Sequence, residues 1–454
     1  MTKGRGSAGR VRIHEPKRLR PLAQEAVDEG GLAGAVRPGE ENEQEVVEFY
    51  WSSADFNGLP VYRIEAESSD LVPIVIAAVR ARHIDVVRGD RHPNPHIKAL
   101  PVDPIEDQIA KIEQHGLGHS CLYPTKEALQ IRSVPDKYNG KPFDVDLAQG
   151  EEQLTFRHFS LTTLEWYRND PRFYYNMDGV RGQIYVKDDS WDSNSEGIDS
   201  LSLPRFGVSF DDELHPAVAV SNWDLHKLSA QQQVWWKQHE LPGKFYLHPD
   251  FAANVAGHWS EGLSLYDAVL QERRMINELS VILGRPPFFR TDYTDSNRPR
   301  ELSFLIRPTR REFDGFVHMV DKLLSDDINV KFFRDEVTIA ERATKDDGTV
   351  VKIPRGTLAI FSDWIERNFS PSPKTKEEVD QALKVLKDVR KLRQRPAHSV
   401  SVDEFDLDYI KEQRELMKRI FQAVRIIRLM LSSMPGAASF EEPDWYQNAK
   451  IWTL

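Results

Sequence analysis

The sequence predicts an α+β protein in which mixed, α/β-type N-terminal and central regions precede an all-helical C-terminal bundle. Two observations predict this class. Short apolar, β-prone runs alternate with helical segments as far as residue 308, whereas the residues after 373 carry apolar side chains at helical spacing over two long stretches. A hydrophobic fraction of 40% in 454 residues is enough for about two or three packed domains.

The composition excludes several classes of protein. The formal net charge of −11 argues against a general nucleic-acid coat or a basic membrane-surface protein, although a local basic patch can still bind RNA. Cys121 is the only cysteine, which excludes an intrachain disulfide framework and a zinc site made of thiolates alone. No run of about 18 apolar residues predicts a transmembrane helix, so we expect no membrane partner and a cytoplasmic location.

The N-terminal part is expected to consist of a disordered tail at residues 1–45 and an α+β region at 46–138. The tail combines Gly, Arg and Pro with a following acidic stretch, and such a composition cannot build a core. An Asn57-Gly58 turn between two apolar runs then predicts a β-hairpin over residues 46–64. A helix over 71–82 and a strand over 84–87 are expected to follow.

An aromatic-rich α+β region is expected over residues 151–308, after a polar boundary. Short β-prone runs predict strands at 183–187, 206–210, 217–220, 245–248 and 302–306. Apolar periodicity predicts helices at 230–240 and 264–283, and Gly284 follows the second helix, where a C-capping glycine belongs.

A helical domain is expected over residues 311–434, with its core at 374–434, and a C-terminal tail at 435–454. The predicted elements are helices at 311–324 and 357–369, a hairpin at 337–353, and two long helices starting near Thr375 and Asp403. Thr375 is followed by Glu378 three residues later, which is the spacing of a capping box.

The two long helices are expected to form an antiparallel hairpin, because only a short break at Pro396 separates them. Their apolar stripes are wide, and a hairpin alone cannot cover both. We therefore expect a homodimer built mainly through residues 375–433.

The junction of these helices reads Arg390-Lys391-Leu392-Arg393-Gln394-Arg395-Pro396-Ala397-His398. An arginine that precedes a histidine by four intervening residues at a helix–helix junction resembles the HEPN superfamily, whose ribonucleases carry an Arg-x4–6-His motif in a helical bundle. The resemblance covers residues 374–434 directly, and 311–434 if the upstream helices complete the bundle. It implies that Arg393 and His398 are the motif residues, with Gln394 where many members have Asn, Asp or His.

Two other pairs fall within the range of four to six intervening residues and are less suitable. Arg91 and His96 lie in a proline-rich loop that cannot form a helical active site. Arg311 and His318 fall within one predicted helix, about 10.5 Å apart along its axis, where a solvated arginine and a surface histidine are the simplest interpretation.

The residue types at the junction suit RNA cleavage without a metal or other cofactor. When the RNA 2′-OH attacks the adjacent phosphorus, a histidine can transfer the proton and an arginine can bind the charged transition state bidentately. His398 and Arg393 are the expected catalytic residues. Arg390, Lys391, Gln394 and Arg395 are expected to contact the RNA, although basic residues also complement the dipole of a helix C-terminus.

The expected function is therefore a metal-independent endoribonuclease, and the resemblance implies a regulated toxin or antiviral effector that responds to a regulatory or phage-derived trigger. Two alternatives stay open: a non-catalytic interaction protein with a helical dimerisation module, and a hydrolase whose site lies in the central region. His115, His119 and Cys121 are metal-ligand types, but the intervening glycines give no helical spacing and a fourth ligand is missing, so no metal site is expected there.

Overall fold

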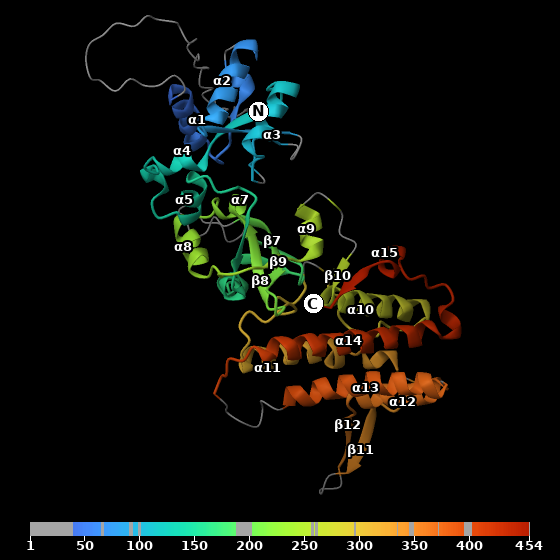
Figure 1. Ribbon diagram of the computed structural model, residues 1–454. Helices are drawn as coiled ribbons and strands as arrows, with labels where there is room; N and C mark the ends of the chain where they lie inside the picture. Colours follow the sequence, from blue (N-terminus) through green and yellow to red (C-terminus); the bar gives the residue numbers. More distant parts are fainter. Residues whose placement is uncertain are drawn as a thin grey trace, which may run out of the picture. The chain divides into compact units, whose positions relative to one another are not determined.

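The computed structural model describes residues 40–64, 68–89, 94–98, 101–187, 202–255, 258, 262–294, 297–333, 335–344, 349–370, 372–394 and 402–453. It confirms the α+β class, with helices and several small sheets along the chain (Figure 1). Within these residues, no helix combines the length and the apolar character that a bilayer span requires.

The chain divides into two compact units whose boundaries differ from those of the predicted regions. Unit 1 comprises Met1–Arg157 together with Ser221–Lys237, and unit 2 comprises His158–Val220 together with Gln238–Leu454. The predicted central region is therefore shared between them, because residues 221–237 belong with the N-terminal part of the chain.

Unit 1 is built around a three-stranded antiparallel sheet of order β1-β3-β2. Its strands are β1 (Leu59–Pro60), β2 (Ile84–Arg88) and β3 (Ser120–Pro124), and its helices are α1 (Glu40–Ser52), α2 (Ser68–Arg80), α3 (Ile105–His115), α4 (Lys126–Gln130), α5 (Pro142–Ala148), α7 (Asn222–Leu225) and α8 (Ala230–Gln238). The predicted helix at 71–82 and strand at 84–87 are confirmed as α2 and β2.

The hairpin predicted over residues 46–64 is wrong. Residues 46–51 belong to α1, which buries Val46, Val47 and Tyr50 on one face, and the two residues of β1 pair with β3. Helix α1 also begins at Glu40, so the last residues assigned to a tail are helical; residues 1–39 lie outside the described residues.

Unit 2 contains a six-stranded sheet of order β4-β8-β7-β6-β5, in which β9 also pairs with β7. Its strands are β4 (Phe156–Phe159), β5 (Phe173–Met177), β6 (Arg181–Val186), β7 (Ser202–Phe210), β8 (Pro216–Ser221) and β9 (Tyr246–Leu247), and the short helices α6 (Glu165–Asn169) and α9 (Pro249–Val255) accompany them. The first four strands predicted for the central region are thus confirmed.

The strand predicted at 302–306 is wrong, because these residues form a buried irregular segment. The backbone of this segment is satisfied by the side-chain amide of Gln413, which accepts from Leu305 N at 3.2 Å and donates to Ser303 O at 2.9 Å. A side chain distant in sequence therefore takes the place of a neighbouring strand.

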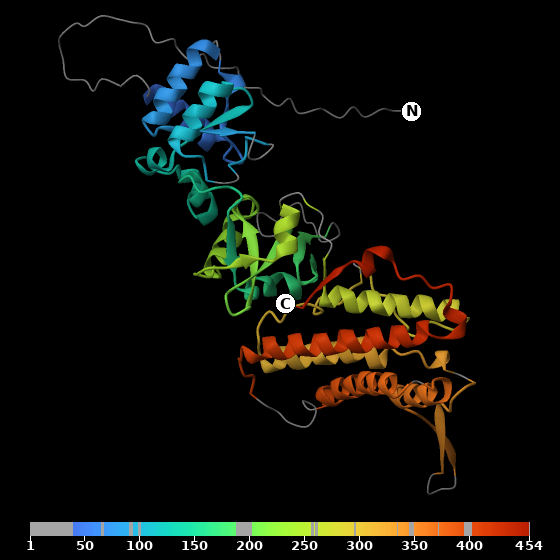
Figure 2. The same cartoon turned by 45° about the vertical axis from the view of Figure 1, so that its right-hand side comes forward.

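The second part of unit 2 is a layer of helices with a β-hairpin attached. The expectation of an all-helical bundle is therefore wrong in this respect. It contains α10 (Leu265–Ile282), α11 (Arg310–Asp321), α12 (Thr357–Asn368), α13 (Pro373–Gln394) and α14 (Asp408–Ser432), and α14 lies between α10 and α13 (Figures 1 and 2). An antiparallel β-hairpin of β11 (Ala340–Thr344) and β12 (Val350–Pro354) projects from it (Figure 2). Helix α10 belongs to this layer although the sequence assigned it to the central region.

The start of α13 also differs from the prediction. The helix begins at Pro373, and the hydroxyl of Ser372 accepts a hydrogen bond from Thr375 N at 3.3 Å. Ser372 therefore caps the helix, and the capping box predicted at Thr375 is wrong.

The apolar stripes of α13 and α14 are covered inside unit 2. Val389 of α13 and Ile420, Val424 and Leu431 of α14 are fully buried, because α14 packs against α10 on one side and α13 on the other. Uncovered stripes were the reason for expecting a homodimer, and that reason does not hold. The homodimer itself stays a prediction.

The predicted C-terminal tail is part of the fold. It forms α15 (Asp444–Gln447) and β13 (Lys450–Trp452), and β13 pairs in parallel with β10 (Gly262–Ser264). The phenol of Tyr446 donates to Glu272 Oε1 at 2.8 Å, and the same carboxylate binds Arg428 Nε at 2.5 Å. Glu272 and Arg428 are buried, so these contacts join the C-terminal segment to the core between α10 and α14.

Candidate functional site

Two arginines at the end of α13 continue its buried face. The helix buries Ala382, Leu386 and Val389, and the same spacing then places Arg390 and Arg393 against α11 and the residues that follow it. A buried apolar stripe thus ends in two cations, which require acidic partners or an anionic ligand.

Two carboxylates meet these arginines. Arg393 Nη1 lies 2.7 Å from Asp321 Oδ2 and 2.5 Å from Asp326 Oδ2. Arg390 Nε lies 3.5 Å from Asp321 Oδ1, and Arg390 Nη2 also contacts Asp326. The Asp321 side chain is fully buried, whereas 39% of the Asp326 side chain is exposed. The cluster therefore has a buried carboxylate at its base and a solvated one at its rim.

A π-helical turn brings the two carboxylates together. Helix α11 ends at Asp321, and Lys322–Asp326 continue it as a π-helix, in which hydrogen bonds join residues five apart. Asp321 and Asp326 are themselves five residues apart, so this turn places both on the side that faces α13. Such turns recur at functional sites.

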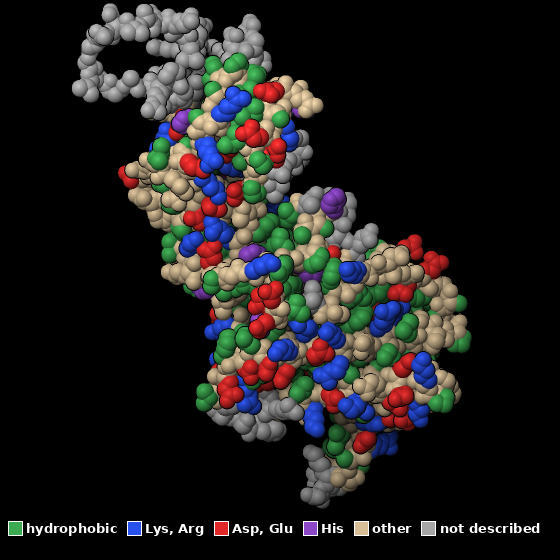
Figure 3. All heavy atoms as spheres, viewed as in Figure 1, with side chains coloured by type: hydrophobic (Ala, Val, Ile, Leu, Met, Phe, Trp, Pro, Cys, Tyr) green, Lys and Arg blue, Asp and Glu red, His purple; other side chains and the backbone are tan. Residues whose placement is uncertain are grey.

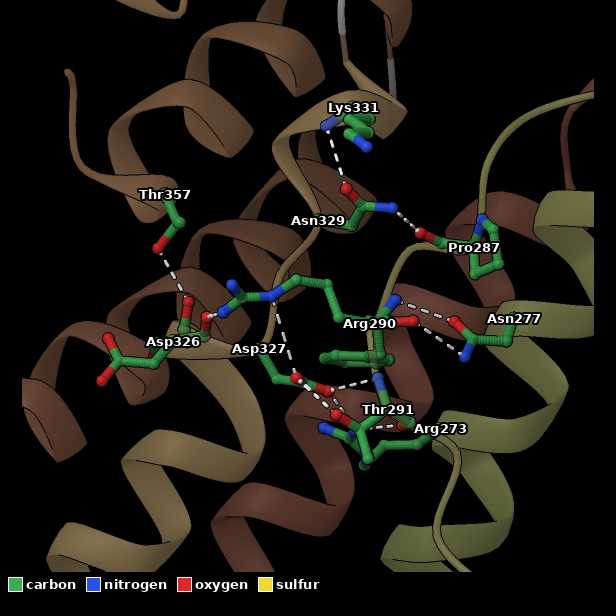
Figure 4. A network of polar contacts seen from close by, with 12 residues as sticks. Arg273, Asn277, Pro287, Arg290, Thr291, Asp326, Asp327, Asn329, Lys331 and Thr357 are labelled. Atoms are coloured by element: carbon green, nitrogen blue, oxygen red, sulfur yellow. Dashed lines mark hydrogen bonds and ion pairs between the residues drawn. The ribbon is translucent and has the colours of Figure 1, made fainter.

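The residue that follows holds the end of this turn from the other side. Asp327 accepts hydrogen bonds from Arg273 Nη2 at 2.7 Å and from Thr291 N at 3.1 Å and Oγ1 at 3.0 Å. Figure 4 shows the side chains of Asp326 and Asp327 pointing away from each other. One carboxylate therefore serves the arginine cluster, and its neighbour anchors the backbone to α10 and to the segment before residue 294.

The charges of the cluster influence two pKa values. The hydrogen bonds that Arg393 donates to Asp321 and Asp326 raise the pKa of Arg393, so its guanidinium stays charged at every accessible pH. Partial burial, helped by the Lys322 ammonium and the Arg393 guanidinium, lowers the pKa of His318 below its ordinary value. The His318 side chain stands on the exposed face of α11, and its lowered pKa favours the neutral imidazole, the form that can accept a proton.

Arg393 is held by one edge only. Its Nη1 makes both carboxylate contacts, whereas Nε and Nη2 have no hydrogen-bond partner among the described residues, and 31% of the side chain is exposed. Two nitrogens on one side of a guanidinium are the donors that bind a phosphate bidentately. Asp321 thus orients an arginine whose other edge can take an anion.

The other predicted site residues divide into two groups. Lys391 and Gln394 are exposed on α13 and make no ion pair or hydrogen bond with the described residues. Arg395 and His398 lie outside the described residues, and the described part of α13 ends at Gln394. The structure therefore brings Arg390 and Arg393 together, and the pairing of Arg393 with His398 stays a prediction.

Sequence reasoning missed three members of this cluster, namely Asp321, Asp326 and His318. His318 had been interpreted as an ordinary surface histidine of its helix. The sequence does show three aspartates at 321, 326 and 327, at the end of a predicted amphipathic helix. This pattern does not predict which basic residues they contact.

The face of unit 2 that Figure 3 shows has no large patch of one charge sign. In Figure 3, Lys and Arg side chains alternate with Asp and Glu over the helices of unit 2. On this face, a long polyanion would therefore find only local attraction.

Other histidines and the cysteine of the sequence contact neighbouring residues of unit 1. The Cys121 thiol is buried, which raises its pKa to about 12, and its Sγ lies 3.6 Å from His96 Nδ1. His226, which is buried, lies between Asp144 Oδ1 at 3.4 Å and Asp55 Oδ1 at 3.5 Å in unit 1. In the part of the chain that is described, no group of three or more His, Cys, Asp or Glu residues is arranged to hold a metal ion.

Comparison of the chain with family models, with curated proteins and with solved structures finds no match.

Proposed function

We propose that the protein is a metal-independent endoribonuclease of HEPN type, in which Arg393 binds the scissile phosphate and His398 transfers the proton. The observation that carries this proposal is the orientation of Arg393 by the buried Asp321, with Nε and Nη2 left without a partner in the described chain. The arginine stands on the last described turn of a helix in a helical layer, and the motif histidine follows five residues later.

Two further observations bear on the roles of individual residues. Lys391 and Gln394 are exposed beside Arg393 and suit contacts to the RNA backbone, together with Arg390 and Arg395. The charge of Arg393 contributes to the lowered pKa of His318, so His318 is a second candidate for the proton-transfer group. In this proposal the protein is a regulated toxin or antiviral effector, and a regulatory or phage-derived trigger controls it.

One observation favours a second candidate, a non-catalytic assembly protein. Arg390 and Arg393 face two carboxylates, so the four charges of the cluster cancel. Such a balanced cluster also serves simply to fasten α13 to the end of α11, because it satisfies the charges at a buried helix contact.

The deciding experiment measures cleavage of an end-labelled single-stranded RNA by the full chain in EDTA. We expect cleavage to continue in EDTA, to leave 2′,3′-cyclic phosphate ends and to stop at a 2′-deoxy position, because the 2′-OH is the nucleophile. His398→Ala is expected to slow cleavage by at least about 100-fold, the loss that follows removal of a general acid–base group. Arg393→Lys is expected to be poor as well, since an ammonium makes no bidentate contact.

Two matched controls separate these roles from general effects. His258→Ala removes another exposed histidine of unit 2, and Lys374→Ala removes a cation at the opposite end of α13; neither should change the rate. If His318→Gln abolishes cleavage and His398→Ala does not, the proton-transfer group is on α11. If cleavage persists without either histidine, or if it requires Mg²⁺, the mechanism proposed for this cluster is wrong and the active site lies elsewhere in the chain. If the chain cleaves no RNA, the assembly role is favoured.

A further inference from the structure

Unit 2 contains a cavity of about 620 Å³ that the proposed ribonuclease site does not use. Its lining residues come from strands β5, β6, β7 and β10, from helices α9, α10 and α15, and from residues 293, 294 and 298. The volume lies within the range of about 300–1,000 Å³ that is common for small-molecule sites.

The cavity carries more positive than negative charge. Four arginines line it, on β6, β7, α10 and the segment after residue 294, and only two aspartates accompany them; the arginines are Arg181, Arg205, Arg274 and Arg298. Asp178 lies 3.6 Å from Arg181 Nε, and Asp267 contacts Arg298. The lining therefore has an excess of two positive charges, in a protein whose overall charge is −11.

Arg274 is the cation with the least internal compensation. Its guanidinium binds only neutral oxygens, Gln271 Oε1 at 3.2 Å and Tyr293 O at 3.2 Å, and no carboxylate of the described chain lies within ion-pair distance. Arg181 Nη1 donates a hydrogen bond to Asn254 Oδ1 at 3.2 Å, which orients its guanidinium. Exposed guanidiniums that backbone and amide oxygens orient are suited to phosphate oxygens.

Aromatic rings occupy other parts of the same lining. Tyr174 is stacked on Tyr185, with 4.4 Å between ring centroids and 15° between planes. Tyr293 lies against Arg273, whose guanidinium is 5.2 Å from its ring, and Trp445 on α15 is 56% exposed. Planar, partly open rings beside cations are typical of sites for a heterocyclic base.

The wall that holds Tyr293 is fixed in place. Asn277 on α10 donates to Phe289 O at 3.0 Å and to Asp292 Oδ1 at 2.7 Å, and Arg273 donates to Thr291 O at 3.0 Å. These contacts hold the segment before residue 294 against α10, so this part of the cavity wall needs no ligand to be held in place. Preformed sites avoid the cost of ordering a loop on binding.

We propose that this cavity binds a nucleoside phosphate, with Arg181, Arg205 and Arg274 around the phosphates and the tyrosine and tryptophan rings against the base. A phosphate alone would leave most of the volume and the rings unused, and an uncharged nucleoside would leave the arginines without an anion. The Asp267 carboxylate has a pKa raised to about 6 by burial and by nearby Asp178, and it can accept a hydrogen bond from a ribose hydroxyl or a base amine.

The test is calorimetric titration of the full chain, without divalent metal, against AMP, ATP, adenosine, glucose 6-phosphate and inorganic phosphate. We expect AMP or ATP to bind at least about tenfold more tightly than the other three compounds. Equal binding of inorganic phosphate or glucose 6-phosphate would overturn the nucleotide assignment, and so would the absence of binding by any nucleotide.

Variants locate the site. Arg274 is exposed and supports no carboxylate, so Arg274→Ala is expected to keep the melting temperature and to weaken nucleotide binding at least about tenfold. Arg425→Ala, which removes an exposed arginine of α14 outside the cavity, should change neither. Unchanged affinity in both Arg274→Ala and Arg181→Ala would place the nucleotide elsewhere and overturn the proposal.

Discussion

The first prediction concerns Asp321, the buried carboxylate beneath Arg390 and Arg393. Replacing it with Asn keeps the shape of the side chain but removes the charge that both arginines share. Breaking a buried ion pair from one side costs about 3–5 kcal/mol. The Arg390 and Arg393 side chains are 26% and 31% exposed, and Asp326 remains beside them, so solvent and Asp326 offset part of this cost.

We therefore expect Asp321→Asn to lower the free energy of unfolding by about 2 kcal/mol, since the arginines are only partly desolvated. For a unit of this size, that corresponds to a fall of about 4–8 °C in Tm. Urea denaturation and a thermal scan would measure the two quantities. Asp326→Asn is the matched control, because its side chain is 39% exposed and its loss should cost no more than about 1 kcal/mol.

Asp321 is a positioning residue in the proposed ribonuclease, so its loss should also affect cleavage. Arg393 would lose the contact that orients its free edge, and we expect kcat to fall more than KM rises. If Asp326→Asn destabilises the protein as much as Asp321→Asn, burial does not set the strength of this cluster. That result would refute the reasoning from exposure.

Four further predictions follow from other parts of the structure. Tyr446→Phe removes the phenol that donates to buried Glu272 at 2.8 Å, so we expect a loss of about 1–2 kcal/mol in urea denaturation, and no loss would mean that the C-terminal segment is not docked as described. Burial raises the pKa of Asp267 from its ordinary value of about 4 to about 6, so the folded state binds the proton of this carboxyl group more tightly than the unfolded state does. The free energy of unfolding should therefore fall by up to about 3 kcal/mol as the pH rises from about 4 to about 6. Asp267→Asn should remove that pH dependence. Glu43 is 3% exposed and lies 2.6 Å from Arg132, so Glu43→Gln should lower the free energy of unfolding of unit 1 by about 2 kcal/mol. If the substitution has no effect, the start of α1 does not pack on unit 1 and belongs to the tail. Light scattering tests the expected homodimer, and a mass near 52.3 kDa at micromolar concentration would contradict it.

Much of the helical layer could be predicted from the sequence because its signal is long. Helices α13 and α14 repeat apolar residues over 22 and 25 residues, and few other structures satisfy that spacing. The N-terminal error has the opposite cause. The β-branched pair Val46-Val47 and the Asn57-Gly58 turn are short signals for a hairpin, and the helical spacing of Val46, Val47 and Tyr50 outweighs them once that face is buried.

The candidate site was predicted only on one side. Arg393 stands at the end of a clear apolar stripe, so its position could be read from α13 alone. Its partners Asp321 and Asp326 are 72 and 67 residues away in sequence, and they face the same arginine only because a π-turn replaces an α-turn between them. No local pattern predicts that turn, and without it Asp326 had no particular partner.

The interleaving of the two compact units has a consequence for the order in which the chain folds during synthesis. Unit 1 needs residues 221–237, which follow most strands of the unit 2 sheet, so it cannot be completed before those strands have emerged. In unit 2, Glu272 is covered by Tyr446, which lies 174 residues later in the sequence, and β10 pairs with β13. Contacts of such sequence separation form late. The buried carboxylate on α10 therefore stays uncovered while the 174 residues up to Tyr446 are synthesised, and during that interval the growing chain is exposed to misfolding and to chaperones.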